Sequence, residues 1–396
     1  MKILYLVDSY YPEIRSATRL ARDLTREWVL QGNAVTLLTP SPDLKHPMSE
    51  EMDGGVRVVR VRSARTKGVN RLARALAEIR LPAVIWRNAG EYLAAHRHDL
   101  IVSYSPTIFF GPLVRRLKRL WGAPSYLILR DIFPLWAADA GVISRRNPIY
   151  HYFEHMARVQ YAAADTIGVQ SSGDLRHFAD TSYRREVLYN WFAPEPPMPD
   201  GVDRRATYGI GNRFVFFYGG NIGVAQNLDV ALRLAADLAD DPRAYFLLVG
   251  EGSETARLDA LIQQRGLGNI SIRPPVPELE YFRLLAEMDV GLLSLDPRLT
   301  NNNFPAKLLG YLSLGKPVLA ALNAGHELFE LLGNAGAGLC AAAEDYPRLL
   351  AHARTLLADP VAARRMGENG RRLAAERFSA PAAARQITSQ FVAAQP

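Results

Sequence analysis

A glycine-rich turn in the second half of the chain is a candidate site for a phosphate group. The apolar run Phe214–Tyr218 ends in three glycines within five residues, and a helical pattern follows. Glycines let backbone amides approach a phosphate, and a helix N-terminus favours negative charge. An ordinary tight turn is the structural alternative. The candidate ligand residues of this turn are Gly219, Gly220, Asn221, Gly223 and Gln226.

A second candidate loop carries asparagines and a lysine. Asn302 and Asn303 precede Pro305, and Lys307 lies on the first turn of the short helix expected after them. Amide side chains and a cation suit a diphosphate and the hydroxyl groups of a sugar. The alternative is that Asn and Pro only cap the helix.

Two more loops place polar residues directly after apolar strands. Gly250 and Glu251 form another strand-to-glycine turn, and Arg130 and Asp131 follow a strand in the first half of the chain. An Arg-Asp pair at the end of a strand could be a structural ion pair or part of a reaction centre, and both readings stay open here.

The elements that position these loops alternate between short apolar runs and helical patterns. This alternation predicts parallel sheets with helices on both faces. Ligands of such sheets bind outside the carboxyl ends of the strands, where these loops lie. The expected strands are Lys2–Val7, Ala34–Thr39, Val56–Val61, Leu100–Ser103, Ser125–Leu129, Thr166–Val169, Glu186–Leu188, Phe214–Tyr218, Ala244–Val249, Ile270–Arg273, Val290–Ser294 and Val318–Ala321.

The chain of 396 residues is long enough for two domains. Four prolines and a glycine between Ala193 and Gly201 interrupt the alternation. We expect an N-terminal domain over 1–192, a linker over 193–210 and a C-terminal domain over 211–378. The helical residues 379–396 are expected to pack back towards the N-terminal domain. The fold class is therefore α/β, with two doubly wound domains that face a central cleft.

The composition narrows the class of protein. Apolar residues make up 48% of the chain and charged residues 22%, which is typical of a globular protein. The single cysteine, Cys340, cannot form a disulfide framework, so a reducing cytoplasm is expected. The sequence contains no run of 18 consecutive apolar residues, so no membrane-spanning helix is expected. The first residues are predicted to form a buried strand rather than a signal peptide.

The net charge of +7 is concentrated in one window of the first half. Leucines, isoleucines and a tryptophan are interleaved with these cations, which favours a membrane surface over nucleic acid. A solvated face is the alternative reading. The window contains one acid, Glu78, and nine basic residues: Arg57, Arg60, Arg62, Arg65, Lys67, Arg71, Arg74, Arg80 and Arg87.

Several short sequence segments, taken in their order along the chain, resemble the GT-B glycosyltransferases of family 4, a retaining class with two Rossmann-like domains. These segments are Tyr10-Tyr11-Pro12, Gln31–Thr39, Leu188-Tyr189-Asn190, Val249–Gly252 and Leu314–Val318. Others are similar to the WbuB-like branch, which is associated with L-fucosamine transfer. These are Ser105–Thr107 with Phe109–Pro112, Arg130–Pro134 with Asp139–Gly141, and Gly220–Gly223 with Gln226.

The resemblance implies a glycosyltransferase that uses a UDP-N-acetylamino sugar, such as UDP-L-FucNAc. It implies an acceptor saccharide on undecaprenyl diphosphate, in bacterial O-antigen, capsule or exopolysaccharide synthesis. The expected location is cytoplasmic, at the anionic inner face of the membrane, without a nucleic-acid partner. No Asp-x-Asp follows a strand, so no metal or other cofactor is expected.

The resemblance also suggests roles for individual residues. Asp131 and Arg130 are expected in the catalytic site, with Arg130 where the family carries histidine. Two glutamates of the family fall at Asn302 and Gly310, so we expect different ribose contacts. The family's arginine and lysine at the diphosphate fall near Gly220 and Gln226, so charge neutralisation is expected from Lys307 or from residues of the first domain. The expected donor-binding residues are Ser16, Gly219, Gly220, Asn221, Gly223, Gln226, Gly250, Glu251, Asn302, Asn303 and Lys307.

Three other functions are alternatives to glycosyl transfer. A dinucleotide-dependent oxidoreductase needs a glycine-rich turn after the first strand, and the residues after Val7 contain none. A sugar-nucleotide epimerase on the same twin fold is mildly disfavoured by the basic and apolar surface. A non-catalytic membrane-surface protein remains the third alternative.

Overall fold

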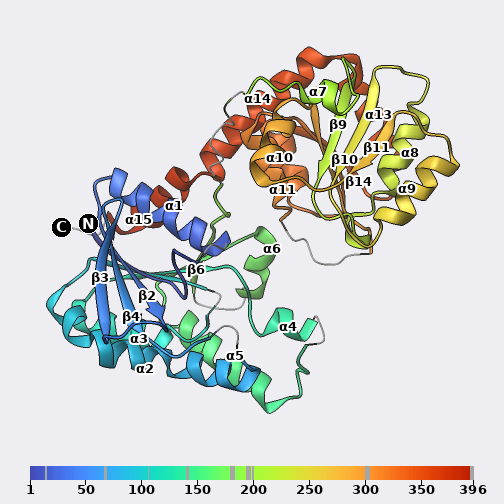
Figure 1. The fold of residues 1–396 in the computed structure, drawn as a ribbon. Coiled ribbons are helices and arrows are strands. Elements are labelled where there is room, and N and C mark those ends of the chain that lie inside the picture. The colour runs from blue at the N-terminus through green and yellow to red at the C-terminus, as the bar shows by residue number, and fades with distance from the viewer. Residues whose placement is uncertain are drawn as a thin grey trace. The chain divides into compact units, whose positions relative to one another are not determined.

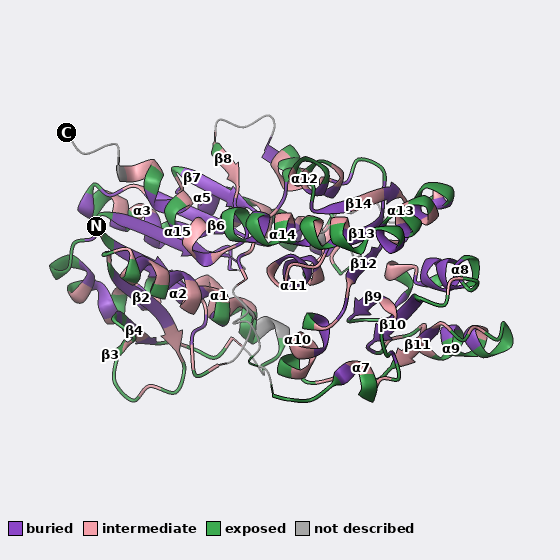
Figure 2. Ribbon diagram, turned by 90° about the horizontal axis from the view of Figure 1, so that it is seen from above, coloured by how far each residue is buried: buried purple, intermediate pink, exposed green. Residues whose placement is uncertain are grey.

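The chain forms two compact units (Figure 1). The computed structural model describes residues 1–13, 16–66, 69–105, 107–139, 142–178, 183–192, 198, 200–298 and 304–392. Unit 1 comprises Met1–Trp191 and Ala380–Pro396, and unit 2 comprises Phe192–Ser379. In both units the strands are largely buried and the helices expose their outer faces (Figure 2).

Unit 1 is built on a sheet of eight strands in the order β3-β4-β2-β1-β5-β6-β7-β8. Only β3 runs antiparallel to its neighbour. The order changes direction between β1 and β5, so the loops after these strands diverge and leave room for a ligand at their carboxyl ends. The strands are β1 Lys2–Leu6, β2 Ala34–Ser41, β3 Met48–Asp53, β4 Val56–Arg62, β5 Leu100–Tyr104, β6 Ser125–Leu129, β7 Thr166–Val169 and β8 Arg184–Val187.

The helices of unit 1 cover the two faces of this sheet (Figure 1). The last helix of the chain packs against the first, because the Trp28 indole is buried between them and donates to the Ala384 carbonyl oxygen at 3.3 Å. Gln390 also donates to the Glu186 carboxylate at 2.6 Å. The helices are α1 Ser16–Leu30, α2 Arg71–Ala95, α3 Gly111–Trp121, α4 Leu135–Asp139, α5 Pro148–Tyr161, α6 Ser172–Leu175 with the 3₁₀ turn η1 Arg176–Phe178, and α15 Ala380–Val392.

Unit 2 contains six parallel strands in the order β11-β10-β9-β12-β13-β14. The direction of this order changes between β9 and β12, which predicts a ligand crevice after these two strands. The strands are β9 Phe214–Gly219, β10 Ala244–Val249, β11 Ile270–Arg273, β12 Val290–Ser294, β13 Val318–Leu322 and β14 Gly338–Ala342. The helices are α7 Arg204–Thr207, α8 Asp229–Asp237, α9 Thr255–Gln264, α10 Glu278–Ala286, α11 Lys307–Ser313, α12 Leu328–Ala335, α13 Tyr346–Ala358 and α14 Pro360–Arg377, with the 3₁₀ turn η2 Val224–Gln226.

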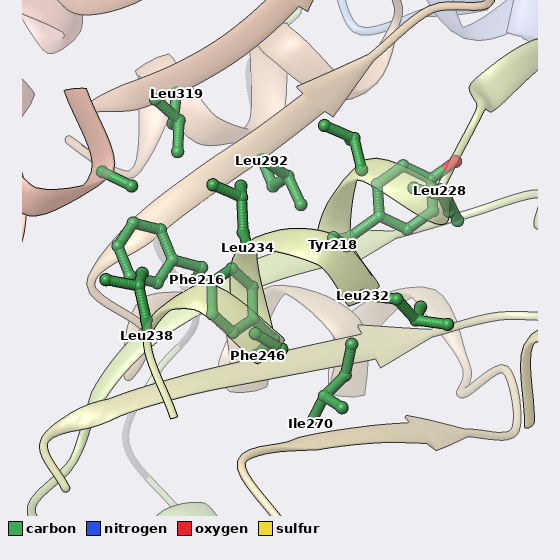
Figure 3. Close-up of a cluster of buried hydrophobic side chains, with 14 of the residues drawn as sticks. Phe216, Tyr218, Leu228, Leu232, Leu234, Leu238, Phe246, Ile270, Leu292 and Leu319 are labelled. Atoms are coloured by element: carbon green, nitrogen blue, oxygen red, sulfur yellow. The ribbon is translucent and has the colours of Figure 1, made fainter. Parts of the chain in front are cut away.

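One core cluster of unit 2 lies between the sheet and its helices (Figure 3). The rings of Phe216 and Phe246 stack in neighbouring strands with their centroids 4.8 Å apart. Tyr218 belongs to the same cluster and lies beside Leu228, with its hydroxyl oxygen at the margin of the apolar side chains. The strand that ends in the glycine-rich turn is therefore held by packing up to the residue before that turn.

The prediction of two doubly wound α/β domains is confirmed in both units. Two strands were not predicted, β3 and β14. The sequence of β3 is acidic and lacks an apolar stripe, and its position depends on pairing with the basic strand β4. Across the described ranges, none of the helices combines the length and apolar character needed to cross a bilayer.

Candidate functional site

A cavity of about 670 Å³ lies in unit 2 at the carboxyl ends of β9 and β10. It adjoins α11, which follows β12, so it occupies the crevice expected from the strand order. Its walls combine glycine-rich backbone, aromatic rings and one lysine. The lining residues are Phe192, Gly219, Gly220, Asn221, Val249, Gly250, Glu251, Pro275, Val276, Glu278, Tyr281, Phe282, Ala306, Lys307 and Gly310.

Lys307 supplies the positive charge of this cavity. Its Nζ donates to the Tyr218 hydroxyl oxygen at 2.8 Å, and the Tyr218 hydroxyl donates to the Asn221 carbonyl oxygen at 2.6 Å. Burial lowers the pKa of Lys307 to about 8. Within the described ranges, no carboxylate forms an ion pair with this lysine. A partly buried cation without an acidic partner is suited to an anionic ligand.

The glycine-rich turns after β9 and β10 lie against each other. Gly250 has φ +157°, and a Cβ atom built on it would lie 1.9 Å from the Gly220 carbonyl oxygen. Gly220 itself has φ +128°. The amide of Ile222 donates to the Glu251 carbonyl oxygen at 2.8 Å. Only glycine allows this approach, so the two turns form one surface of backbone groups at the cavity.

Gln226 orders the turn without lining the cavity. Its side-chain oxygen accepts from the Gly223 amide at 3.2 Å and from the Asn221 side chain at 3.1 Å. The predicted donor residues of this turn are therefore brought together, but in two roles. Asn221 and the first glycines lie at the cavity, while Gly223 and Gln226 support the turn from behind.

An aromatic wall faces the glycines, and it was not predicted from the sequence. A Cβ atom at Gly219 would lie 2.2 Å from the Tyr281 ring, so glycine makes room for that ring. Tyr281 and Phe282 lie on α10, with centroids 5.2 Å apart. At Gly310, where the resembled family carries glutamate, a Cβ atom would lie 3.4 Å from Phe282. The sequence signal that could have revealed this wall is that its helix, α10, is the element that follows the strand β11.

Arg130 and Asp131 diverge in unit 1. The Arg130 guanidinium is buried, donates from Nη1 to the Leu188 carbonyl oxygen at 2.7 Å, and lies 5.1 Å from the Trp191 ring centroid. Asp131 is exposed, and the pKa of its carboxyl is raised by partial desolvation, with Arg130 opposing that shift. Arg130 thus ties the loop after β6 to residues 188–191, while Asp131 is available to a ligand.

Three of the predicted site residues cannot be placed in this way. Asn302 and Asn303 lie outside the described residues. Ser16 is the first residue of α1 in unit 1, and its side chain also lies outside the described part of the chain. Their assignment to donor binding stays a prediction.

Three acidic residues outside the basic window, and Glu78 within it, partly neutralise its charge. Pairs with N–O distances of 2.7, 2.5, 2.6 and 2.7 Å join Arg57 to Glu50, Arg60 to Glu51, Arg65 to Asp43 and Arg74 to Glu78. The sequence count therefore overstates the free charge. A groove of about 530 Å³ lies beside α2. Three other arginines of the window, Arg62, Arg80 and Arg87, line it together with Leu76 and Val84.

Both units match models of known protein families. Residues 203–373 match the family model described as glycosyl transferases group 1, and residues 17–191 match the glycosyl transferase 4-like domain. A glycosyl transferase named for colanic acid biosynthesis, WcaI of Escherichia coli (strain K12), is 26% identical over 385 residues, which cover 91% of this chain and 93% of that protein.

Solved structures share the whole fold. Sucrose-phosphate synthase from Thermosynechococcus elongatus superposes with a TM-score of 0.65 at 19% identity, covering 100% of both chains. The Anabaena protein HepE, solved in complex with UDP, gives a TM-score of 0.62 at 19% identity, over 99% of this chain and 100% of that chain. These likenesses show the GT-B fold, with two Rossmann-like domains.

Proposed function

Since the chain is a glycosyltransferase of the GT-B fold, with a 4-like domain followed by a group 1 domain, we propose that it transfers an N-acetylamino sugar from a UDP-sugar to a lipid-linked glycan. The observation that carries the proposal is the cavity of unit 2, where Lys307 lies beside glycine-rich turns and an aromatic wall. This combination suits a nucleoside diphosphate, because the phosphates need cations and amides while the base needs an apolar wall.

The donor would lie with its diphosphate at Gly220, Asn221 and Lys307. Bond cleavage between the sugar and the diphosphate leaves negative charge on the nucleotide, and groups held in place before the reaction stabilise that charge. Lys307 supplies such stabilisation, whereas the amides of Gly220 and Ile222 already donate to the carbonyl oxygens of Val249 and Glu251 at 2.9 and 2.8 Å and instead fix the shape of the turn. We extend the proposal to transfer without a divalent cation, since the lysine offers the charge that a metal ion would otherwise provide.

The acceptor would bind to unit 1 near Asp131. In the proposed retaining reaction, the acceptor hydroxyl attacks from the face that the nucleotide leaves, and a phosphate oxygen takes the hydroxyl proton. Asp131 orients the acceptor rather than serving as an obligatory base. Arg130 acts as a positioning residue, because its guanidinium is held by the Leu188 carbonyl oxygen.

A membrane location would bring the enzyme to its lipid-linked acceptor. The groove beside α2 supports this part of the proposal, since Arg80 and Arg87 are exposed there and Leu76 is 51% exposed. Arginines beside apolar side chains favour an anionic membrane surface. We place the enzyme at the inner face of the cytoplasmic membrane.

The finer assignment is a bacterial surface polysaccharide, O-antigen or capsule, with L-FucNAc as the transferred sugar. Its support is the set of segments similar to the WbuB-like branch, such as Gly220–Gly223 with Gln226. The relative named for colanic acid biosynthesis is in accord with the polysaccharide class.

The direct test is thermal unfolding of the full chain with UDP, GDP, ADP, dTDP or NAD, each with and without EDTA. A ligand that binds only the folded state raises the unfolding midpoint. We expect UDP to give the largest shift and EDTA to leave it unchanged. A shift with NAD alone, or with none of these nucleotides, would overturn the proposal. A UDP shift abolished by EDTA would contradict its metal-independent part.

A further inference from the structure

A second cavity, of about 460 Å³, lies in unit 1 and adjoins the loop that carries Asp131. Ile132 and Phe133 line it, and they directly follow Asp131 in the chain. We propose that this cavity binds a pyranose ring of the acceptor saccharide. The inference rests on the proposed function for its setting, since it assigns the acceptor that function requires, and its volume lies in the range of small-molecule sites, about 300–1,000 Å³.

The floor of the cavity is aromatic and well packed. Tyr150, Tyr161 and Phe178 are 7%, 8% and 3% exposed, respectively. The rings of Tyr161 and Phe178 meet edge to face with centroids 5.2 Å apart. Tyr161 also contacts Tyr183, whose ring centroid is 6.4 Å away. Rings fixed in this way present flat apolar surfaces, which suit the C–H face of a pyranose.

The same rings bring polar groups to the cavity. Tyr150, Tyr161 and Tyr183 each carry a hydroxyl that can both donate and accept a hydrogen bond. Within the described part of the chain, none of these three hydroxyls hydrogen-bonds to a protein group. Burial raises the pKa of Tyr161, so its hydroxyl stays protonated and able to donate at neutral pH. Tyrosine hydroxyls without a protein partner can form hydrogen bonds with the hydroxyl groups of a sugar.

The rim of the cavity is charged. Arg158 pairs with Glu154 at 3.2 Å, and their side chains are 69% and 37% exposed. Such an exposed pair contributes little to folding, so both groups can turn to a ligand at small cost. A guanidinium and a carboxylate at an aromatic cavity offer donors and acceptors for sugar hydroxyls.

These groups also favour a saccharide over the isoprenyl chain of a lipid carrier. An isoprenyl chain would bury the tyrosine hydroxyls and the rim charges without hydrogen bonds, and each such burial is unfavourable. A sugar satisfies them. The aromatic floor and polar rim together therefore fit a ring with one apolar face and several hydroxyls.

Saturation-transfer NMR on the full chain tests the inference without knowledge of the natural acceptor. The probes are the methyl glycosides of N-acetylglucosamine, galactose and rhamnose, with geranyl phosphate as the isoprenoid probe. We expect at least one glycoside to receive saturation at its ring C–H protons, and we expect saturating UDP to leave that signal in place. The variants Arg158→Ala and Tyr183→Phe should each weaken glycoside binding about three- to tenfold, as loss of a hydrogen bond does.

The variant Tyr152→Phe is the matched control, since Tyr152 lies on the same helix but does not line the cavity. Absence of saturation in every glycoside, or a signal that survives both cavity variants, would overturn the inference. A signal displaced by UDP, or geranyl phosphate bound in place of glycosides, would also overturn it. The UDP-induced shift in unfolding midpoint is measured on each variant. If UDP causes no such shift in the wild type, the proposed function is contradicted. If the shift is present but no glycoside binds, only the assignment of this cavity is contradicted.

Discussion

The Nζ atom of Lys307 lies 2.8 Å from the hydroxyl oxygen of Tyr218. This contact joins the first residue of α11, the helix that follows β12, to the end of β9. The strand order of unit 2 changes direction between β9 and β12. It holds the one lysine of the cavity lining beside the glycine-rich turn, and the Nζ atom also lies 4.2 Å from the Tyr218 ring centroid. Neither contact neutralises the charge, so it remains available to an anion.

The affinity for UDP should fall as the pH rises through about 8, where burial places the pKa of Lys307. Below that pH the lysine is a cation that attracts the diphosphate, and above it the lysine is neutral. The terminal phosphate of UDP titrates lower, near about pH 6 by analogy with phosphorylated side chains, so it adds no slope here. Calorimetric titration at several pH values measures the effect. A Lys307→Arg variant should bind UDP with a flat profile, and a flat wild-type profile would contradict the role of Lys307.

Alanine at Gly250 should both destabilise unit 2 and weaken UDP binding. Its Cβ atom would lie 1.9 Å from the Gly220 carbonyl oxygen, at a φ of +157° that side chains avoid. The backbone strain alone costs about 1–3 kcal/mol, and the displaced turn also loses its position at the cavity. Denaturant unfolding and UDP titration check the two effects. Gly268→Ala is the control, because no atom lies within 4 Å of its Cβ position; equal effects in both variants would contradict this account.

Asp131→Asn should lower transfer to the acceptor by about a hundredfold, the order expected when a reacting group is misplaced. The UDP-induced shift in unfolding midpoint should stay as in the wild type, because the donor cavity is formed by unit 2 alone. Product formation from UDP-sugar and a lipid-linked acceptor extract measures the first effect. Asp174→Asn makes the same change in charge on the neighbouring helix α6. Full activity of Asp131→Asn would remove Asp131 from the site.

Charge reversal of Arg80 and Arg87 should abolish binding to vesicles that contain anionic lipid. Both arginines line the groove beside α2, and no acidic partner is found for them within the described residues. Sedimentation with vesicles at low and high salt measures the binding, which should weaken as salt rises. The double variant of Arg65 and Arg74 to glutamate is the control, since both have acidic partners. An equal loss in the two double variants would show that net charge alone governs binding.

Much of the fold could be predicted because parallel strands buried on both faces have nearly continuous apolar runs. The strands Ser125–Leu129 and Ala244–Val249 were predicted with the ends that the structure shows. The edge strand β3 has no such run, because it is exposed and held by ion pairs such as Arg57 with Glu50. Long-range pairing of this kind leaves no periodic signal in the sequence. For the same reason, the charge of the basic window was overestimated.

The candidate site was only partly predictable. Gly220, Gly250 and Lys307 were predicted because they follow apolar strands, and the structure brings all three to one cavity. Tyr281 and Phe282 read as ordinary core residues of a helix, and the place of the Tyr281 ring in the cavity wall depends on the absence of a side chain at Gly219 in another element. The inward direction of Arg130 depends on the carbonyl of Leu188, 58 residues away in the chain, which no local pattern reveals.

Calorimetric titration of UDP into the wild type, Lys307→Met and Lys316→Met most directly tests the assignment of the donor site. Lys316 is the matched control, because burial likewise lowers its pKa to about 8, while its Nζ donates to the Ala286 carbonyl oxygen at 2.6 Å outside the cavity lining. We predict that Lys307→Met weakens UDP binding about tenfold or more, as expected for loss of a charge-assisted contact, whereas Lys316→Met binds as the wild type does. Equal affinities in all three proteins, or no binding of UDP to the wild type, would contradict the account.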